Sequence, residues 1–322
     1  MQRPLFFDAE LESTFIALGA VKIALLAPAE LQDLQHAFQQ LRPADAFDPR
    51  TRRAQSPNQA DYHCTFLDTD LDYRRQVQAL IARSCGPQIA RVLRGYRILT
   101  ANIYVKPPGT GMFEIHQNWP TCPRFDQTSV TVWIPLQDVD AGNGGIHVVP
   151  GSHKIVPDIA ALNAPAFFQD FAPALVDKYL QPVPLQAGQA LVFCDSLLHW
   201  SPPNLSAAPR AAIQIELVPE EVSTVLYWLD RQRPQDGFEV FEVPSSFFTE
   251  RSITDLMDRP QGLRSRGRLA NPNRPLSESE FLQKLAQGPS TRASLYYRRD
   301  LSGCAIPPPG ADALADAYAV QS

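Results

Sequence analysis

The N-terminal part of the chain carries apolar residues at helical spacing. In residues 28–41 and again in residues 73–92, they recur at intervals of three or four, which places them on one face of a helix. Glu30 in the first turn favours the earlier helix, because an acidic side chain stabilises a helix N-terminus. In the later segment Gly86 and Pro87 are expected to break the helix.

From about residue 97 the pattern changes to short runs rich in β-branched and aromatic residues, separated by Gly and Pro clusters. Such runs predict strands joined by turns. The predicted strands cover residues 97–105, 129–136, 146–149, 189–193 and 211–218. Many short strands with turns between them are typical of a β-barrel or sandwich.

After residue 228 the strand pattern weakens. Residues 245–257 and 277–286 are predicted to form short helices. Ser277 with Glu280 resembles a capping box, the reciprocal pair that begins many helices. No motif in this part of the sequence indicates chemistry.

The 322 residues are interpreted as a single domain, 1–322. The pattern divides it into a β core at about 95–220, N-terminal helices within 28–92 and a C-terminal helical and loop extension, 228–322. The extension is expected to pack on the core as a lid or an oligomer surface, which leaves room for a homodimer. Residues from about 307 onward are expected to be disordered.

Composition narrows the partners. The formal net charge of -5 argues against nucleic acid, which a basic patch would attract. No apolar run is long enough to span a membrane, and no apolar signal core follows Met1, so a cytoplasmic location is expected. Five cysteines, an odd number without a C-x-x-C pair, argue against a disulfide framework and a zinc site.

Candidate chemistry lies in two segments about eighty residues apart. In an extended segment alternate side chains face the same side, so His116 and Asn118 can face one point. His199 ends an apolar run just before a Pro-rich turn. Two imidazoles and one oxygen ligand on one face of Fe(II) leave three positions open. Arg210 begins the next predicted strand, where its guanidinium can grip a carboxylate through two hydrogen bonds.

Four motifs together resemble the phytanoyl-CoA dioxygenase family of Fe(II)- and 2-oxoglutarate-dependent oxygenases. They are KPP (106–108), HQNWP (116–120), NGGIHVVPGSHK (143–154) and HWSPPNLSAAPR (199–210). The resemblance covers roughly residues 15–220, and its specificity comes from the last two blocks occurring at the expected separation. It implies a mainly β chain with flanking helices, folded as a double-stranded β-helix (a cupin-like jelly roll).

The resemblance also implies roles for individual residues. His116 and His199 would be iron ligands, and Arg210 would bind the distal carboxylate of 2-oxoglutarate. Further co-substrate contacts implied by position are Trp133, Ser201 and Asn102. Core packing for Trp133 and a turn hydroxyl for Ser201 are equally good interpretations. The candidate substrate contacts are Gln117, Trp119, His147 and Gln214.

The chain departs from the family pattern at the third metal ligand. The family has H-x-D, whereas this sequence has Asn118. An amide oxygen can coordinate a metal, although more weakly than a carboxylate. The protein is then an active enzyme with Asn118 or water as the third ligand, a degenerate binding protein, or an enzyme carrying a deliberate Asp-to-Asn change. Because Arg210 and the other motifs are intact, an enzyme is the preferred interpretation.

The predicted function is therefore oxidation of a C–H bond in a small metabolite by O₂ with Fe(II) and 2-oxoglutarate. Hydroxylation, desaturation and cyclisation are all compatible with the motifs, and natural-product biosynthesis is the expected setting. The alternatives are a catalytically impaired or non-catalytic 2-oxoglutarate- or metabolite-binding protein of the same fold, and a cupin-like metal enzyme that does not use 2-oxoglutarate. The motifs do not select a substrate.

Overall fold

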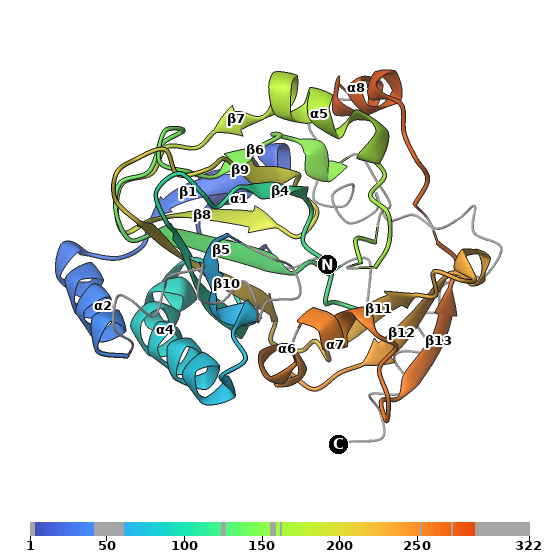
Figure 1. Cartoon of the computed structure of the whole chain (residues 1–322), viewed down its shortest axis with the longest axis horizontal. Helices are drawn as coiled ribbons and strands as arrows, with labels where there is room; N and C mark the ends of the chain where they lie inside the picture. Colours follow the sequence, from blue (N-terminus) through green and yellow to red (C-terminus); the bar gives the residue numbers. More distant parts are fainter. Residues whose placement is uncertain are drawn as a thin grey trace.

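The computed structural model describes residues 4–41, 61–123, 127–154, 159–161, 163–251, 253–271 and 273–286. Its longer helices lie at the edge of a strand-rich body (Figure 1). The α-helices are α1 (Ala9–Leu18), α2 (Pro28–Leu41), α4 (Leu71–Val92), α5 (Ala172–Ala174), α6 (Phe247–Glu250), α7 (Ile253–Met257) and α8 (Glu278–Ala286). None of the helices in the described ranges is both long and apolar enough to cross a membrane.

The strands form three antiparallel sheets. The large sheet has the order β1-β8-β5-β10-β3-β2, the small sheet the order β4-β9-β6-β7, and a separate sheet the order β11-β12-β13. Their bounds are β1 (Ala20–Ala24), β2 (His63–Cys64), β3 (Tyr96–Lys106), β4 (Phe113–His116), β5 (Val130–Pro135), β6 (His147–Val148), β7 (Gln181–Pro182), β8 (Gln189–Cys194), β9 (His199–Ser201), β10 (Arg210–Pro219), β11 (Val225–Leu229), β12 (Phe238–Glu242) and β13 (Ser265–Leu269).

The large and small sheets enclose a cavity between them, because one cavity is lined by side chains from both. Two facing antiparallel sheets with helices outside are the jelly roll that the sequence predicts, so the expected fold class is confirmed. The five strands predicted from pattern correspond to β3, β5, β6, β8 and β10. The core also includes β1 and β2, which come from before residue 95.

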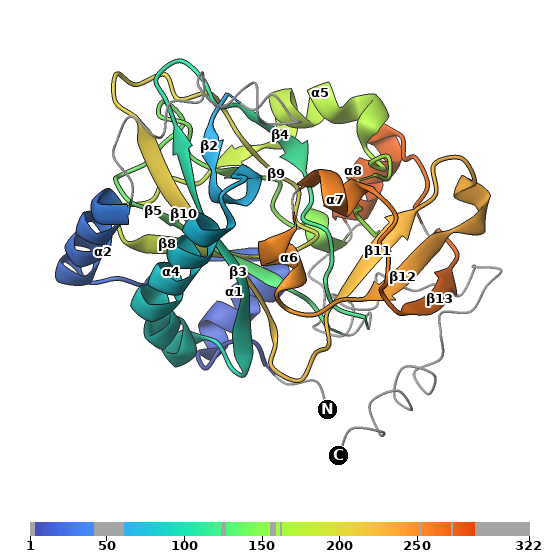
Figure 2. The ribbon, with the colours of Figure 1, turned by 60° about the horizontal axis from the view of Figure 1, so that its bottom comes forward.

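Strand β10 shows how a strand of the large sheet gives one face to the core and the other to the cavity. On β10, Ile213 and Ile215 are fully buried in the main hydrophobic cluster. That cluster includes residues of α2 and α4, which cover the outer face of the sheet (Figures 1 and 2). Gln214, with the opposite parity, is only half-buried and lines the cavity. Alternate side chains of the strand therefore pack in the hydrophobic core or line the cavity.

The N-terminal helices confirm one prediction and correct another. Helix α2 has the predicted bounds, 28–41. The expected break near Gly86 and Pro87 is wrong, because α4 runs without interruption from Leu71 to Val92 with Pro87 inside it. An internal proline costs about 3 kcal/mol. Burial of a row of apolar side chains along α4 outweighs that cost. They are Tyr73, Val77, Leu80, Ile81, Cys85 and Ile89.

The C-terminal part contains more β structure than its sequence indicates. Strands β11, β12 and β13 form a sheet beside the barrel (Figure 2). The predicted helices are present as α6, α7 and α8. The capping box at α8 is confirmed in both directions: the Ser277 amide donates to Glu280 at 2.9 Å, and the Glu280 amide donates to the Ser277 hydroxyl at 3.3 Å. The predicted disorder from about residue 307 lies outside the described residues.

Candidate functional site

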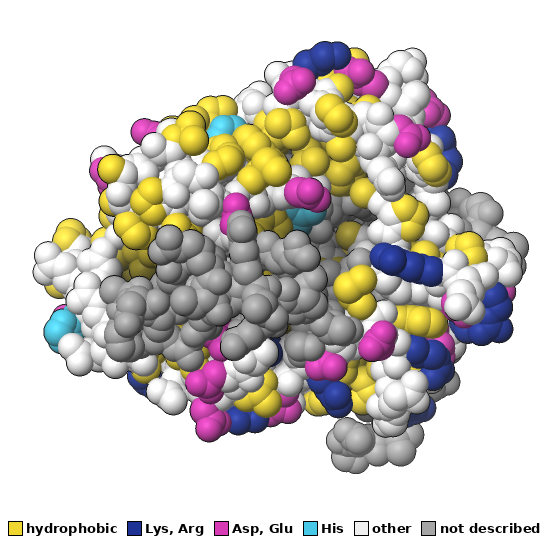
Figure 3. Space-filling model, viewed as in Figure 1, with side chains coloured by type: hydrophobic (Ala, Val, Ile, Leu, Met, Phe, Trp, Pro, Cys, Tyr) yellow, Lys and Arg dark blue, Asp and Glu magenta, His cyan; other side chains and the backbone are white. Residues whose placement is uncertain are grey.

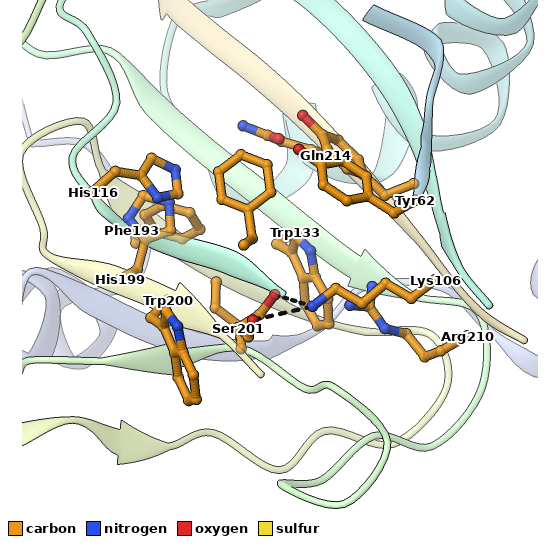
Figure 4. A pocket seen from close by; sticks show the side chains of 13 residues that line it. Tyr62, Lys106, His116, Trp133, Phe193, His199, Trp200, Ser201, Arg210 and Gln214 are labelled. Carbon is orange, nitrogen blue, oxygen red and sulfur yellow. Dashed lines mark hydrogen bonds between the residues drawn. The ribbon is translucent and has the colours of Figure 1, made fainter. Parts of the chain in front are cut away.

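Two histidines predicted to bind metal lie side by side at the mouth of the barrel. His116 ends β4, His199 begins β9, and the two residues are paired in the sheet register. Their ring centroids are 4.0 Å apart. Figure 4 shows both imidazoles at one end of the cavity. Backbone pairing brings together two side chains that are 83 positions apart along the chain.

Both imidazoles are oriented by a backbone carbonyl two residues earlier in the chain. Nδ1 of His116 lies 2.7 Å from the Glu114 carbonyl oxygen, and Nδ1 of His199 lies 2.9 Å from that of Leu197. A carbonyl only accepts, so Nδ1 carries the proton and Nε2 keeps a free lone pair. Burial lowers the pKa of His116 to about 4 and that of His199 well below its usual value. Two neutral, fixed imidazoles suit a divalent metal.

Two buried basic side chains, Arg210 and Lys106, lie at the other end of the same cavity. Arg210 begins β10 and lies opposite Lys106 on β3; only 2% of its surface is exposed. One guanidinium nitrogen donates to the Gly144 carbonyl at 2.7 Å, whereas the buried Nε has no hydrogen-bond partner. The guanidinium carbon lies 5.5 Å from the centre of the Trp133 ring. An incompletely bonded, buried arginine favours an anion.

Lys106 is the functional residue that the sequence analysis did not single out. Its Nζ donates to the Ser201 hydroxyl and, at 3.3 Å, to the Ser201 carbonyl (Figure 4), and it also donates to the Pro202 carbonyl at 2.7 Å. Burial lowers its pKa to about 6, and the charge of Arg210 acts in the same direction. In the sequence, the KPP motif supports only the family resemblance and indicates no role for Lys106. Its chemical meaning depends on the β3–β10 register, which places the amine beside Arg210.

The structure separates the predicted co-substrate contacts. Trp133 and Ser201 line the cavity with Arg210 and the histidines. Asn102 does not: it lies opposite Gln214 on β10 and lines a smaller cavity farther along the barrel. Other members of the first cavity wall are aromatic, and sequence alone gave no signal for them. They are Tyr62, Tyr104, Phe113, Phe193 and Trp200.

Asn118 faces a different part of the interior from His199. Its amide nitrogen donates to the Thr131 hydroxyl at 2.8 Å, and that hydroxyl donates to Glu216 at 2.9 Å. Asn118 lines the larger cavity together with His116, and also the smaller cavity that contains Glu216. No cluster of three or more His, Cys, Asp or Glu side chains suited to a metal occurs in the described ranges. A third ligand would therefore be an amide, water or co-substrate.

The carboxyl group of Glu216 is held in its neutral form. Burial raises its pKa to about 8, and the charge of Asp195 acts in the same direction, whereas the hydrogen bond from Thr131 opposes it. Tyr104, whose pKa is raised well above its usual value, also lies within electrostatic range. Glu216 is thus protonated at neutral pH in the ligand-free protein.

We expect Glu216 to make the protein less stable as pH rises from about 4.5 to about 8. In that window the folded protein keeps this proton and the unfolded chain has lost it, so raising the pH favours unfolding. The slope from one group is at most about 1.4 kcal/mol per pH unit. Urea unfolding of the wild type and of Glu216→Gln should give stability curves that diverge across this range. Parallel curves would contradict the prediction.

A larger cavity of about 500 Å³ adjoins the histidines. Gln117, Trp119 and Gln214, three of the predicted substrate contacts, line it. His147, the fourth, is absent from the cavity linings found in the described ranges; its ring packs edge-on against Trp200 with centroids 5.2 Å apart. Figure 3 shows hydrophobic, acidic and basic side chains around the hollow on this face. The site therefore combines paired imidazoles, two buried basic side chains and a larger, mostly apolar cavity.

Comparison with known proteins identifies the family. A family model described as Phytanoyl-CoA dioxygenase (PhyH) matches residues 18–212, more than half of the chain. The chain belongs to this family, and the resemblance inferred from its motifs is confirmed. The family consists of Fe(II)- and 2-oxoglutarate-dependent oxygenases, so the enzyme class and both cofactors expected from the motifs are those of the family.

Individual relatives are more distant. A phytanoyl-CoA dioxygenase of Arabidopsis thaliana is 28% identical over 130 residues, covering 38% of this chain and 46% of the relative. Phytanoyl-CoA dioxygenase 1 of Oryza sativa subsp. japonica is 28% identical over 134 residues, covering 40% and 48%. The chain thus matches just under half the length of these curated relatives.

Solved structures of similar shape are remote. The 2-oxoglutarate-dependent carbocyclase SnoK from nogalamycin biosynthesis is 17% identical, with a TM-score of 0.46 over 85% of this chain and 95% of that one. EctD from S. alaskensis, solved with 2-oxoglutarate and 5-hydroxyectoine, is 18% identical, with a TM-score of 0.48 over 83% and 87%. The family assignment rests on the family model.

Proposed function

We propose that this protein is an Fe(II)- and 2-oxoglutarate-dependent oxygenase that oxidises a C–H bond of a small metabolite. The observation that carries the proposal is the arrangement of one cavity: two neutral imidazoles with free Nε2 atoms at one end, and a buried, incompletely bonded arginine at the other. A dicarboxylate that chelates a metal through one end and needs a cation at the other matches this arrangement.

Each side chain has a definable task in this proposal. His116 and His199 would hold iron through Nε2, and the carbonyl oxygens at Nδ1 keep the rings in place. Arg210 and Lys106 would bind the distal carboxylate of 2-oxoglutarate, with Ser201 positioning the Lys106 amine. Bound iron would supply O₂ activation coupled to oxidation of 2-oxoglutarate to succinate and CO₂. The protein would position the substrate and exclude side reactions.

Hydroxylation, desaturation and cyclisation are all compatible with the cavity. A role in natural-product biosynthesis, a cytoplasmic location and a homodimer are further parts of the proposal. They rest on the breadth of the family and on the sequence. Cell fractionation and measurement of the molar mass in solution would test the last two directly.

The function is tested by anaerobic loading with Fe(II) and 2-oxoglutarate, followed by admission of O₂. We expect consumption of 2-oxoglutarate and formation of succinate above the rate without protein, with further acceleration by a substrate. Stable binding of both cofactors with succinate at background across a broad amine and alcohol panel would favour the non-catalytic alternative instead. The non-catalytic alternative is retained because Asn118 stands where the family has a carboxylate ligand.

We expect binding of 2-oxoglutarate to take up a proton at Lys106. Its pKa is about 6 in the ligand-free protein, and a bound carboxylate raises it. Affinity should therefore fall as pH rises above about 6, by up to about tenfold per pH unit while the proton is being gained. Calorimetry of the Ni(II)-loaded protein in buffers with different ionisation enthalpies measures the uptake. Lys106→Met should abolish it, and equal heats in all buffers would contradict the assignment.

A further inference from the structure

The smaller cavity, called the side chamber below, lies next to the larger one. It has a volume of about 60 Å³, roughly the share of two water molecules in the liquid. The two cavities share five lining residues, so the chamber borders the proposed substrate site. The shared residues are Phe66, Tyr104, Asn118, Trp119 and Gln214.

The side chains that β10 contributes to the interior change from basic to acidic along the strand. Arg210 lies opposite Lys106 at its start, and Glu216 lies opposite Thr100 and Thr131 six residues later. Six residues of strand span roughly 20 Å. The two cations and the carboxyl group therefore occupy opposite ends of the barrel. An anionic co-substrate is attracted to the first end. Among the described residues no cationic side chain lines the cavity at the second end, although the guanidinium carbon of Arg74, which is not a lining residue, lies 5.5 Å from the centre of the Phe66 ring.

Two oxygen atoms in the side chamber lack hydrogen-bond partners. Glu216 lines the chamber, and its Oε1 is buried without a partner. Thr121 also lines it; the residue is 1% exposed, and its Oγ1 is likewise without a partner. Burial of an unsatisfied polar atom costs about 1–3 kcal/mol. A small group that donates hydrogen bonds would satisfy both atoms once Glu216 has lost its proton, and a bound cation favours that loss by lowering the pKa of the carboxyl group.

The remaining walls favour a positive charge on that group. Phe66, Tyr104, Trp119 and Phe248 surround the chamber, and the faces of aromatic rings attract cations. No Lys, Arg or His belongs to the chamber wall among the described residues. In the larger cavity the charged lining residue is Glu114, again acidic. Phosphates and carboxylates on a substrate would meet no cation among the described lining residues of the chamber.

We propose that Glu216, Thr121 and the surrounding aromatic rings form a subsite for an ammonium group. The substrate is then an amine whose apolar body occupies the larger cavity beside His116. The inference rests on the proposed function in taking this cavity as the substrate site. It assigns the substrate class, which excludes acyl-CoA esters and other phosphate-bearing compounds.

Three probes with one indole ring and different end groups test the subsite by calorimetry on the full chain: tryptamine, tryptophol and indole-3-acetate. We expect tryptamine to bind at least tenfold more tightly than tryptophol, and indole-3-acetate not to bind. Glu216→Gln should remove the tryptamine preference and leave tryptophol binding within twofold, because glutamine keeps the shape of the side chain. Thr121→Val should weaken tryptamine binding by a smaller factor.

Glu220→Gln is the matched control, since it removes an exposed carboxylate four residues after Glu216 that lines none of these three cavities. Its tryptamine preference should equal that of the wild type. Loss of the preference in Glu220→Gln instead of Glu216→Gln, equal binding of tryptamine and tryptophol, or no tryptamine binding at millimolar concentration would each overturn the subsite. Succinate formation with no amine preference overturns the subsite alone, whereas amine preference with no 2-oxoglutarate turnover overturns only the proposed function.

Discussion

Replacing Asn118 by aspartate should strengthen Fe(II) binding by about 10- to 100-fold, a range typical of changes around metal ligands. The change adds a negative charge beside a divalent cation and replaces an amide oxygen by a harder, anionic ligand. Both effects act in the same direction. In the third ligand position, which the family fills with aspartate, the amide is the weakest element of this site.

The measurement is an anaerobic titration with Fe(II), repeated with Co(II) to follow the coordination geometry by its visible spectrum. Asn118→Ala is the control, because it removes the amide oxygen without adding charge. If the amide oxygen coordinates the metal, affinity should follow the order Asp, Asn, Ala. Equal affinities for all three would show that position 118 lies outside the coordination sphere and that the two histidines act with water or co-substrate.

The hydrogen bonds around Asn118 make the aspartate variant informative in a second way. In the present protein the amide donates to Thr131, and Thr131 donates to Glu216. An aspartate carboxylate can only accept, so the single hydroxyl proton of Thr131 must turn toward the new carboxylate or stay with Glu216. A protonated Glu216 can then donate to Thr131 in place of the lost contact. We therefore expect the pKa of Glu216, already about 8, to rise further.

Asparagine is consequently well matched to its neighbours. A neutral donor at position 118 completes a chain that ends on a buried carboxyl group, with no hydroxyl proton shared between two acceptors. This fit favours an asparagine that belongs to the structure over an isolated loss of the aspartate. It also links the metal end of the cavity to the side chamber, because Asn118 lines both.

The long strands were predictable from sequence because their period is unambiguous. On β3 and β10 every second residue is apolar and buried against the helices. Strands β4 and β9 have four and three residues, too few for a periodic signal, although they carry both histidines. The motifs identified the two histidines, whereas these two strands were not predicted. The helix break at Pro87 was predicted wrongly because local propensity was weighed without the packing that surrounds α4.

The site, too, could be predicted only as far as its residues stand in motifs, because a single sequence does not give the tertiary contacts. His116, His199 and Arg210 stand in recognisable motifs, and the structure brings them to one cavity. Lys106, Asn102 and Glu216 acquire meaning only from the register of β3 against β10, which places Lys106 beside Arg210 and Asn102 beside Gln214, farther along the barrel. Register depends on pairing across about a hundred residues, and a single sequence does not state it.

Replacing Arg210 by alanine should weaken 2-oxoglutarate binding by about 2–5 kcal/mol, the usual cost of removing one partner of a buried charge pair. The corresponding loss of affinity is roughly 30-fold or more. Lys106 alone is a weaker partner, because its pKa is about 6 and it must take up a proton before it carries a charge, while its Nζ also donates to Ser201 and Pro202. Binding to the Ni(II)-loaded protein, measured by calorimetry, separates this effect from turnover. Succinate formation should fall with it.

Two further variants separate the effect of removing the positive charge of Arg210 from the effect of removing its packing and its planar shape. Arg210→Met keeps most of the side-chain volume against Trp133, so it should lose 2-oxoglutarate binding while the thermal midpoint falls less than in Arg210→Ala. Arg210→Lys keeps the charge without the planar fork and should have intermediate affinity.

Metal binding in the absence of 2-oxoglutarate should stay within twofold of the wild type in all three Arg210 variants, because the histidines lie at the other end of the cavity. Wild-type affinity for 2-oxoglutarate in Arg210→Met would remove the cation pair from the co-substrate site and favour a cupin-like metal enzyme that works without 2-oxoglutarate.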